Sequence, residues 1–210
     1  MDRKILMIAG PNGAGKTTMT LELIRDCRML YEFINADEIA RGLAPKHPES
    51  MALTASKLMI KRLKELLEAK KNFVFETTAS GTNYIKYLNA AKIEGYELSL
   101  TFLWLSAPEE AVRRVAQRVQ QGGHNIPEAS IIRRYYSGIK NIITKYLPLV
   151  DEALIIDSSS QEQEGLVQSE WVEREKSAKR VIARKNKHGS VQVLDRLIWR
   201  KMEKIADEQE

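Results

Sequence analysis

The chain passes from a strand-like run into a helix-like run through Gly10-Pro11-Asn12-Gly13-Ala14-Gly15-Lys16-Thr17-Thr18. The run before this stretch, residues 4–9, is apolar and suited to a β-strand, and residues 19–29 have helical character. The first and last glycines and the Lys16-Thr17 pair stand at the spacing of a phosphate-binding loop. Small residues let backbone N–H groups wrap a phosphate, and the helix N-terminus adds partial positive charge. The stretch therefore predicts a P-loop that binds a nucleoside triphosphate.

Two side chains of this loop have expected roles, and the cofactors expected from them are ATP and Mg²⁺. Lys16 should bridge the β- and γ-phosphates as a catalytic residue, and the Thr17 hydroxyl should ligate the metal. The alternative is a glycine-rich turn that only looks like a P-loop, which the flanking strand and helix disfavour. The expected nucleotide-binding residues are Gly10, Pro11, Asn12, Gly13, Ala14, Gly15, Lys16, Thr17 and Thr18.

The composition is that of a globular enzyme. With 210 residues, 43% of them hydrophobic and 29% charged, the chain can form one packed core, which excludes wholesale disorder. The single cysteine, Cys27, allows no internal disulfide and is expected to be packed and inert in a reducing compartment. No apolar run approaches the roughly 20 residues that span a bilayer, and the N-terminus leaves no room for a signal peptide. We therefore expect a cytoplasmic protein that makes no membrane contact.

Strands and helices alternate along the chain. Strands are expected at residues 4–9, 31–35, 72–76, 98–105 and 153–157, and helices at 19–29, 51–67, 84–93, 108–121 and 128–146. This alternation predicts an α/β fold, a P-loop NTPase with a five-stranded, mostly parallel sheet flanked by helices. Residues 1–158 would form this core. Residues 159–210 would form an extension with a polar linker at 158–164, a hairpin at 181–194 and a helix at 195–206.

Two acidic residues follow predicted strands, at the edge where parallel sheets bind their ligands. Phosphoryl transfer needs a carboxylate within hydrogen-bond reach of the acceptor hydroxyl. Asp37 is the candidate base and also a candidate substrate-binding residue. Glu38 is an alternative for the base, and a helix N-cap is an alternative role for Asp37.

Glu76, Thr77 and Thr78 end the third predicted strand and are candidates for binding the acceptor. A buried strand seldom ends in glutamate unless the acid has a partner. Glu76 could bind substrate hydroxyls or Mg²⁺-bound water, or it could form a purely structural pair. The two threonines would add hydroxyl groups to the same crevice.

Arginines flank the glycine-containing break at residues 122–127, which indicates a mobile helical lid at about 118–134. A guanidinium that closes over the γ-phosphate would neutralise the charge that spreads over its oxygens, and Arg118 and Arg134 are the candidates for this catalytic role. Arg114 is a candidate for contacting the adenine. The alternative is a solvated basic helix face. We expect His124 to hydrogen-bond the lid loop and assign it no catalytic role.

Together these segments resemble the zeta-toxin family of P-loop kinases, most closely its chromosomal branch of predicted ATPases. The resemblance covers about residues 3–157 and rests on four segments, residues 10–18, 35–38, 75–78 and 122–127. It implies a nucleoside-kinase-like fold, ATP with Mg²⁺, and an antitoxin protein as a candidate partner. The family's toxins phosphorylate a sugar hydroxyl of UDP-N-acetylglucosamine, so the resemblance implies a nucleotide-sugar acceptor. By position, it implies Asp37 as the base, Glu76 against the sugar, and phosphate contacts from Arg118 and Arg134.

Three other readings of the sequence are weaker. An ABC-type ATPase would also need an LSGGQ-like signature and a strand ending in Asp-Glu, and the sequence has neither. A nucleic-acid-associated kinase is suggested by the basic residues between Arg174 and Lys187, but no aromatic residues interleave with them as stacking platforms would require. A switch that hydrolyses ATP slowly remains open, and it differs from a kinase in needing no added acceptor.

Overall fold

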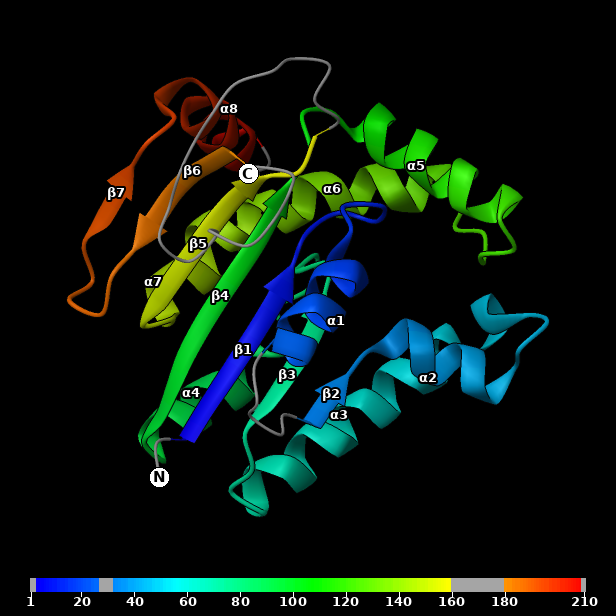
Figure 1. Cartoon of the computed structure of the whole chain (residues 1–210), viewed down its shortest axis with the longest axis horizontal. Coiled ribbons are helices and arrows are strands. Elements are labelled where there is room, and N and C mark those ends of the chain that lie inside the picture. Colours follow the sequence, from blue (N-terminus) through cyan, green and yellow to red (C-terminus); the bar gives the residue numbers. More distant parts are fainter. Residues whose placement is uncertain (1–2, 27–31, 160–179, 209–210) are drawn as a thin grey trace.

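The computed structural model describes residues 3–26, 32–159 and 180–208. Five parallel strands build most of its sheet, in the order β2-β3-β1-β4-β5 (Figure 1). They are β1 (Arg3–Ala9), β2 (Glu32–Ile34), β3 (Phe73–Thr77), β4 (Tyr96–Trp104) and β5 (Glu152–Asp157). The α/β class and the five parallel strands are therefore confirmed. Cys27 and residues 160–164 of the expected linker lie outside the described residues.

The sheet has seven strands rather than five because the expected C-terminal hairpin joins it. In this hairpin, β6 (Arg180–Lys185) pairs antiparallel with β5, and β7 (Val191–Val193) pairs antiparallel with β6. This hairpin was expected in a separate extension of the core, residues 159–210. Its strand β6 covers the outer edge of β5, which would otherwise leave unpaired backbone groups beside a buried apolar strand.

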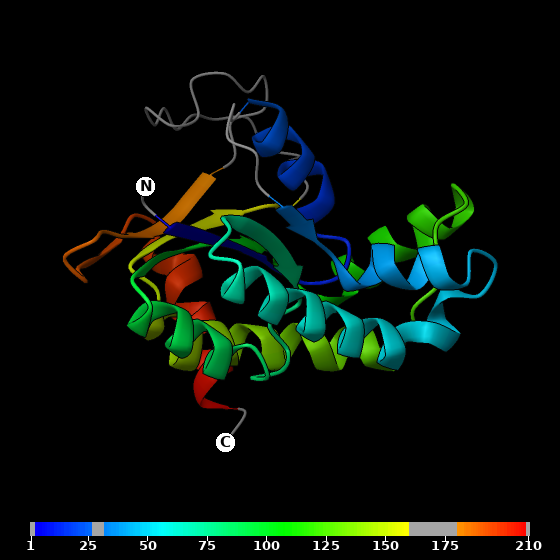
Figure 2. The same cartoon turned by 90° about the horizontal axis from the view of Figure 1, so that it is seen from below.

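Helices cover both faces of the sheet (Figure 2). Helix α1 (Lys16–Asp26) lies on one face. The other face carries α3 (Ala52–Glu68), α4 (Ile85–Ile93), α6 (Glu128–Asn141) and α8 (Arg196–Asp207). Between these layers the core is built on large apolar side chains that are fully buried, among them Phe73, Phe75, Phe102, Trp104 and Tyr135. No helix of residues 3–26, 32–159 and 180–208 has the length and hydropathy that a membrane crossing requires.

Two further helices extend past the carboxyl ends of the strands. Helix α2 (Ala36–Leu43) follows β2 and packs on α3 through the short 3₁₀ turn η1 (Pro48–Met51). Helix α5 (Pro108–Gln120) follows β4, and its connection to α6 reaches toward the α2–α3 connection in Figure 1. Helix α2 is not among the expected helices and is only eight residues long.

The expected continuous helix over 128–146 changes its winding near its end. Helix α6 stops at Asn141, the segment η2 (Ile142–Tyr146) is a π-helix, and the short α7 (Leu147–Leu149) follows. The π turn places the buried Tyr146 hydroxyl 2.6 Å from the Gly81 carbonyl oxygen, to which it donates. The loop that follows β3 is thereby attached to this helix.

The strand register brings the site residues to one edge of the sheet. Ile8 of β1 lies opposite Glu76 of β3, one residue before β1 ends. Ile34 of β2 lies opposite Phe75, so the next residue along β2, Asn35, lies beside Glu76. The P-loop, the end of β3 and the start of α2 therefore meet.

Candidate active site

The P-loop connects β1 to α1 in a compact turn. The Ala14 amide donates to the Pro11 carbonyl at 3.3 Å, and the helix begins at Lys16. Gly13 has φ +79°, and a Cβ there would lie 2.9 Å from Cβ of Arg114, so glycine is needed for α5 to approach the loop. The first N–H groups of α1 lie at the loop, where they suit an anion.

Lys16 folds back over the loop. Its Nζ donates to the carbonyl oxygens of Gly10 at 2.9 Å and Pro11 at 2.8 Å. Burial lowers the pKa of this ammonium to about 8, against the opposing charges of Glu76 and Asp37. The ammonium group of Lys16, which is expected to bind the phosphates, therefore lies at the P-loop near the carboxylates of Glu76 and Asp37.

Glu76 is 5% exposed and is surrounded by donors. Its Oε2 accepts from the Thr17 hydroxyl at 2.9 Å and from Asn35 Nδ2 at 2.7 Å, and its Oε1 accepts from the Thr20 hydroxyl at 2.7 Å. Burial raises the pKa of this carboxyl, while the bonds from Thr20 and Thr17 and the charge of Lys16 lower it. The buried carboxylate of Glu76 is thus satisfied by three donors next to the P-loop, the side chains of Thr17, Thr20 and Asn35.

Thr20 and Asn35 had no expected role in the sequence analysis. The signal for Thr20 is its position three residues after Thr17 on a helix, which puts both hydroxyls on one face. The signal for Asn35 is its place between a strand and a helix, where asparagine often caps. Neither pattern by itself names Glu76 as the common partner.

These groups fit a Mg²⁺ ion bound with nucleotide. The Thr17 hydroxyl donates its proton to Glu76, so its lone pairs remain for a cation. Magnesium in phosphoryl-transfer sites is commonly held by one or two carboxylates together with substrate phosphates and water. The described part of the chain contains no group of three or more His, Cys, Asp or Glu side chains arranged to hold a metal by themselves. Thr17 and Glu76 would therefore hold the ion only together with the nucleotide.

Asp37 lies at the second position of α2. Asn35 caps this helix through its side-chain oxygen, so the expectation that Asp37 could be the N-cap is wrong. The Asp37 side chain is 49% exposed and its Oδ2 lies 3.9 Å from Nε2 of His124. Glu38, the alternative base, forms an exposed ion pair with Arg41 at 2.8 Å instead.

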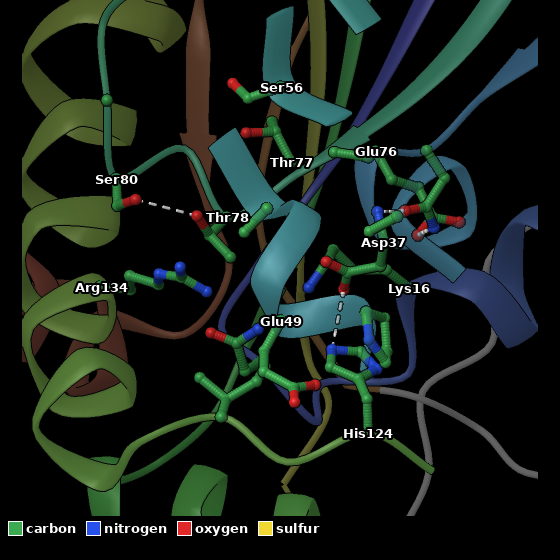
Figure 3. Close-up of a pocket in the computed structure, with 18 of the residues that line it drawn as sticks. Lys16, Asp37, Glu49, Ser56, Glu76, Thr77, Thr78, Ser80, His124 and Arg134 are labelled. Carbon is green, nitrogen blue, oxygen red and sulfur yellow. Dashed lines mark hydrogen bonds and ion pairs between the residues drawn. The ribbon is translucent and has the colours of Figure 1, made fainter. Parts of the chain in front are cut away.

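A cavity of about 450 Å³ opens beside the P-loop (Figure 3). Lys16, Asp37 and Glu76 line it, together with residues of η1, α3 and the lid. Thr77 and Thr78 also line it, and the Thr78 hydroxyl lies 2.9 Å from that of Ser80. Its other polar lining residues are Asn12, Asn35, Glu49, Ser56, Asn83, Tyr84, His124, Asn125 and Arg134.

The structure separates the three candidate arginines. Arg134 lines the cavity and makes no hydrogen bond or ion pair with any described residue. Arg118 does not line it; its Nη2 donates to the His124 carbonyl at 3.2 Å, and burial lowers its pKa. Arg114 lies behind the P-loop, where its Nη2 donates to the Ser158 carbonyl at 2.7 Å and it pairs with Glu110 at 2.8 Å.

His124 links the lid to α2. Its side chain is 9% exposed, and burial lowers its pKa, which keeps the ring neutral at pH 7 despite the nearby Asp37. Arg118 donates to the backbone carbonyl of His124. The expected hydrogen bonding of this residue within the lid is present, and the contact with Asp37 is an addition to it.

Curated relatives match parts of the chain. An uncharacterized protein of Haemophilus influenzae is 28% identical over 135 residues, which are 64% of this chain and 94% of that protein. A cytidylate kinase of Saccharolobus islandicus is 28% identical over 96 residues, which are 41% of this chain and 50% of the kinase. The chain thus spans only about half the length of that kinase.

Solved structures share the fold at low sequence identity. The AvrRxo1-ORF1:AvrRxo1-ORF2 complex with sulphate ions matches with a TM-score of 0.68 at 16% identity, over 96% of this chain and 63% of that one. A chain of the PezAT chromosomal toxin–antitoxin system of Streptococcus pneumoniae matches with a TM-score of 0.55 at 17% identity, over 74% of this chain and 68% of that one. At these identities the likeness establishes the fold alone.

A match to a protein-family model shows the family of this chain. The family model AAA_33, an AAA domain, matches residues 5–134, which include the P-loop, Asp37, Glu76 and Arg134. This match covers more than half of the chain and every residue that lines the cavity. With its P-loop and its α/β sheet, the chain belongs to the AAA_33 family of AAA domains.

Proposed function

We propose that the chain is an ATP-dependent phosphotransferase, which moves the γ-phosphate of ATP to a hydroxyl of a small acceptor. The observation that carries this proposal is the meeting of Lys16, Asp37 and Glu76 in one cavity. An enzyme that only hydrolyses ATP needs a phosphate loop and a position for water. A cavity of about 450 Å³ beside that loop, lined by both polar and apolar side chains, also has room for an acceptor.

The nucleotide would bind at the P-loop. Lys16 would exchange its two backbone carbonyls for the β- and γ-phosphates, and Arg114, fixed behind the loop by Ser158 and Glu110, would face the base. Thr17, with Glu76 behind it, would hold Mg²⁺, which neutralises phosphate charge when bound. Glu76 would thus act on the metal side of the site as well as lining the acceptor cavity.

Asp37 would take the acceptor's proton. Its side chain lines the cavity and is partly exposed. The Asp37 Oδ2 atom lies 3.9 Å from Nε2 of His124, too far for a short ion pair that would hold the carboxylate. The new bond joins the acceptor oxygen to the γ-phosphorus while the bond from that phosphorus to the β–γ bridging oxygen breaks and ADP leaves. Arg134, from α6, would neutralise the transferring group, and Arg118 would hold the lid loop.

The acceptor we propose first is a nucleotide-sugar. Carboxylates and hydroxyls line the cavity, and each hydroxyl of a sugar needs such a partner once water is excluded. The resemblance to the zeta-toxin kinases points to the same class. PezAT is a toxin–antitoxin system, so we propose an antitoxin-like protein as a partner of this chain. Co-purification of the chain with a small protein encoded by an adjacent gene would test this proposal.

A phosphotransfer screen tests the function. Wild-type protein and the Lys16→Ala variant are incubated with γ-labelled ATP, Mg²⁺ and panels of UDP-sugars, nucleosides and small polyols. We expect label on one class of acceptor with the wild type and none with Lys16→Ala. If ATP is consumed at the same rate with and without every acceptor, the chain is an ATP-hydrolysing switch and the kinase proposal fails.

A further inference from the structure

The side-chain amide of Asn35 contacts two parts of the site, the first turn of α2 through its oxygen and Glu76 through its nitrogen. Its Oδ1 accepts from the backbone N–H groups of Asp37 at 2.8 Å and Glu38 at 3.4 Å. Its Nδ2 donates to Oε2 of Glu76 at 2.7 Å and lies 3.5 Å from the Thr17 hydroxyl oxygen. Backbone N–H groups can only donate and a carboxylate accepts, so the partners themselves fix which end of the amide is which.

The residue is held in this place from several sides. It is 8% exposed, and it directly follows β2, whose last residue, Ile34, lies opposite Phe75. Glu76, the next residue of β3, therefore lies at a fixed offset from it. The first turn of α2, which carries Asp37, starts from the same amide.

We propose that Asn35 is a positioning residue that ties Asp37 to the Thr17–Glu76 pair. This inference rests on the proposed function, in which Asp37 is the base and Thr17 with Glu76 holds Mg²⁺. A single rigid amide then sets the distance between the group that takes the acceptor's proton and the groups that hold the metal and its nucleotide. Loss of this link would loosen both sides of the site at once.

The choice of asparagine separates this role from simple capping. Asp, Ser and Asn cap helices about equally well. An aspartate here would cap α2, but it would remove a donor from Glu76 and put a second carboxylate where the amide of Asn35 now donates. A serine would also cap, but its side chain is too short to reach Glu76 as well. Only asparagine among these residues satisfies the helix and the carboxylate together.

Two variants test the inference, with water as the phosphate acceptor so that no other acceptor needs to be known. In Asn35→Asp we expect the Mg²⁺-dependent rate of ATP hydrolysis to fall about 10- to 100-fold, as is typical when a group that orients a metal ligand is lost. We also expect its melting temperature to fall, because two carboxylates would meet at a buried position. In Asn35→Ser we expect the same loss of rate with a smaller drop in melting temperature, because serine still caps the helix and adds no charge.

Asp195→Asn is the matched control. Asp195 caps α8 through the amides of Leu197 at 3.0 Å and Ile198 at 3.1 Å, away from the cavity. Asp195→Asn replaces a capping acid by an amide, whereas Asn35→Asp replaces a capping amide by an acid. The control should leave the rate of ATP hydrolysis unchanged. Binding of a fluorescent ATP analogue, with and without Mg²⁺, is measured alongside for every variant.

The outcomes separate this inference from the function on which it rests. If both Asn35 variants hydrolyse ATP at the wild-type rate and bind the analogue with unchanged Mg²⁺ dependence, Asn35 is only a cap and the inference is wrong, while the kinase proposal stands. If the variants bind the analogue more weakly with Mg²⁺ and equally without it, the inference holds even where hydrolysis is too slow to measure. A wild-type protein that binds no ATP overturns both.

Discussion

Lys16 keeps a positive charge in a place largely shielded from water. Burial lowers its pKa to about 8, below its ordinary value of 10.5. Below pH 8 the side chain is protonated in both the folded and the unfolded chain, and burying that charge costs stability. Between about pH 8 and 10.5 the folded state binds fewer protons than the unfolded state, so this cost is relieved as pH rises.

Replacing the charged side chain should therefore stabilise the ligand-free fold. We expect Lys16→Met to melt at a higher temperature than the wild type at pH 7, and the difference to shrink when both proteins are melted at pH 10. Thermal unfolding without nucleotide at the two pH values measures this. A lower melting temperature for Lys16→Met at pH 7 would mean that its bonds to Gly10 and Pro11 outweigh the burial cost.

Asp37 and Glu38 can be separated by one pair of substitutions. Asp37→Asn should bind ATP as the wild type does and lose phosphoryl transfer by about 10²-fold or more, the scale of a lost general base. Glu38→Gln should cost little, because Glu38 only pairs with Arg41 on the surface. Nucleotide affinity and initial rates of transfer measure both effects. The reverse pattern would move the base to Glu38.

The loop after β3 is held in shape by the helix behind it. Ala79 has φ +54°, which is strained for alanine, and its carbonyl accepts from Nδ2 of Asn141 at 2.9 Å. A Cβ on Gly138 would lie 2.6 Å from the Thr78 carbonyl oxygen, so only glycine lets α6 pack this closely. The cavity wall that Thr78 and Ser80 form is therefore set by α6 and η2.

Two buried tyrosines allow a matched test of this arrangement. Tyr146→Phe removes the bond to Gly81, and Tyr135→Phe removes a similar bond, 2.8 Å long, to the Leu105 carbonyl beyond β4. Each should cost about 1 kcal/mol of stability. Amide hydrogen exchange of residues 78–83 should become faster in Tyr146→Phe alone. Equal exchange in both variants would show that the hydroxyl does not hold the loop.

Local patterns predicted the long elements and missed features that depend on contacts between distant residues. The helices at 51–67 and 108–121 and all five parallel strands were within about two residues of the structure where it describes them, because each has a strong apolar period. The alternative that Asp37 caps a helix is wrong by two residues, because Asp and Asn cap equally well and only the backbone path shows that Asn35 accepts the amides of the first turn. The π turn at 142–146 was also missed; it ends at Tyr146, whose hydroxyl contacts Gly81, 65 residues away in the sequence.

At the scale of the whole molecule, the Lys185 side chain adds to the backbone pairing that joins the C-terminal hairpin to the rest of the sheet. Nζ of Lys185 in β6 donates to the carbonyl oxygens of Leu147 at 2.8 Å and Val150 at 2.6 Å, where η2 and α7 end. Its pKa is lowered by burial. The sequence showed the hairpin but not this attachment, since a lysine in a strand predicts only an exposed position.

Removing that attachment should destabilise the protein as a unit. We expect Lys185→Met to lower the free energy of unfolding by about 1.5–3 kcal/mol, the range for hydrogen bonds from a charged group. Lys201→Met, on the exposed side of α8, is the control and should change it by less than about 0.5 kcal/mol. Urea unfolding followed by tryptophan fluorescence measures both. Equal effects would mean that the pairing of β6 with β5 suffices without the lysine.

The pairing of β6 with β5 also sets a time order for synthesis of the protein. Every residue of the candidate site precedes Asp157, the last residue of β5, and Lys185 at the end of β6 comes 28 residues later. At about 5–20 residues per second on the ribosome, β5 has an unpaired edge for roughly 1 to 6 s. A nascent chain thus carries the P-loop and both carboxylates before its sheet is complete, and the edge of β5 is paired only after β6 has left the exit tunnel.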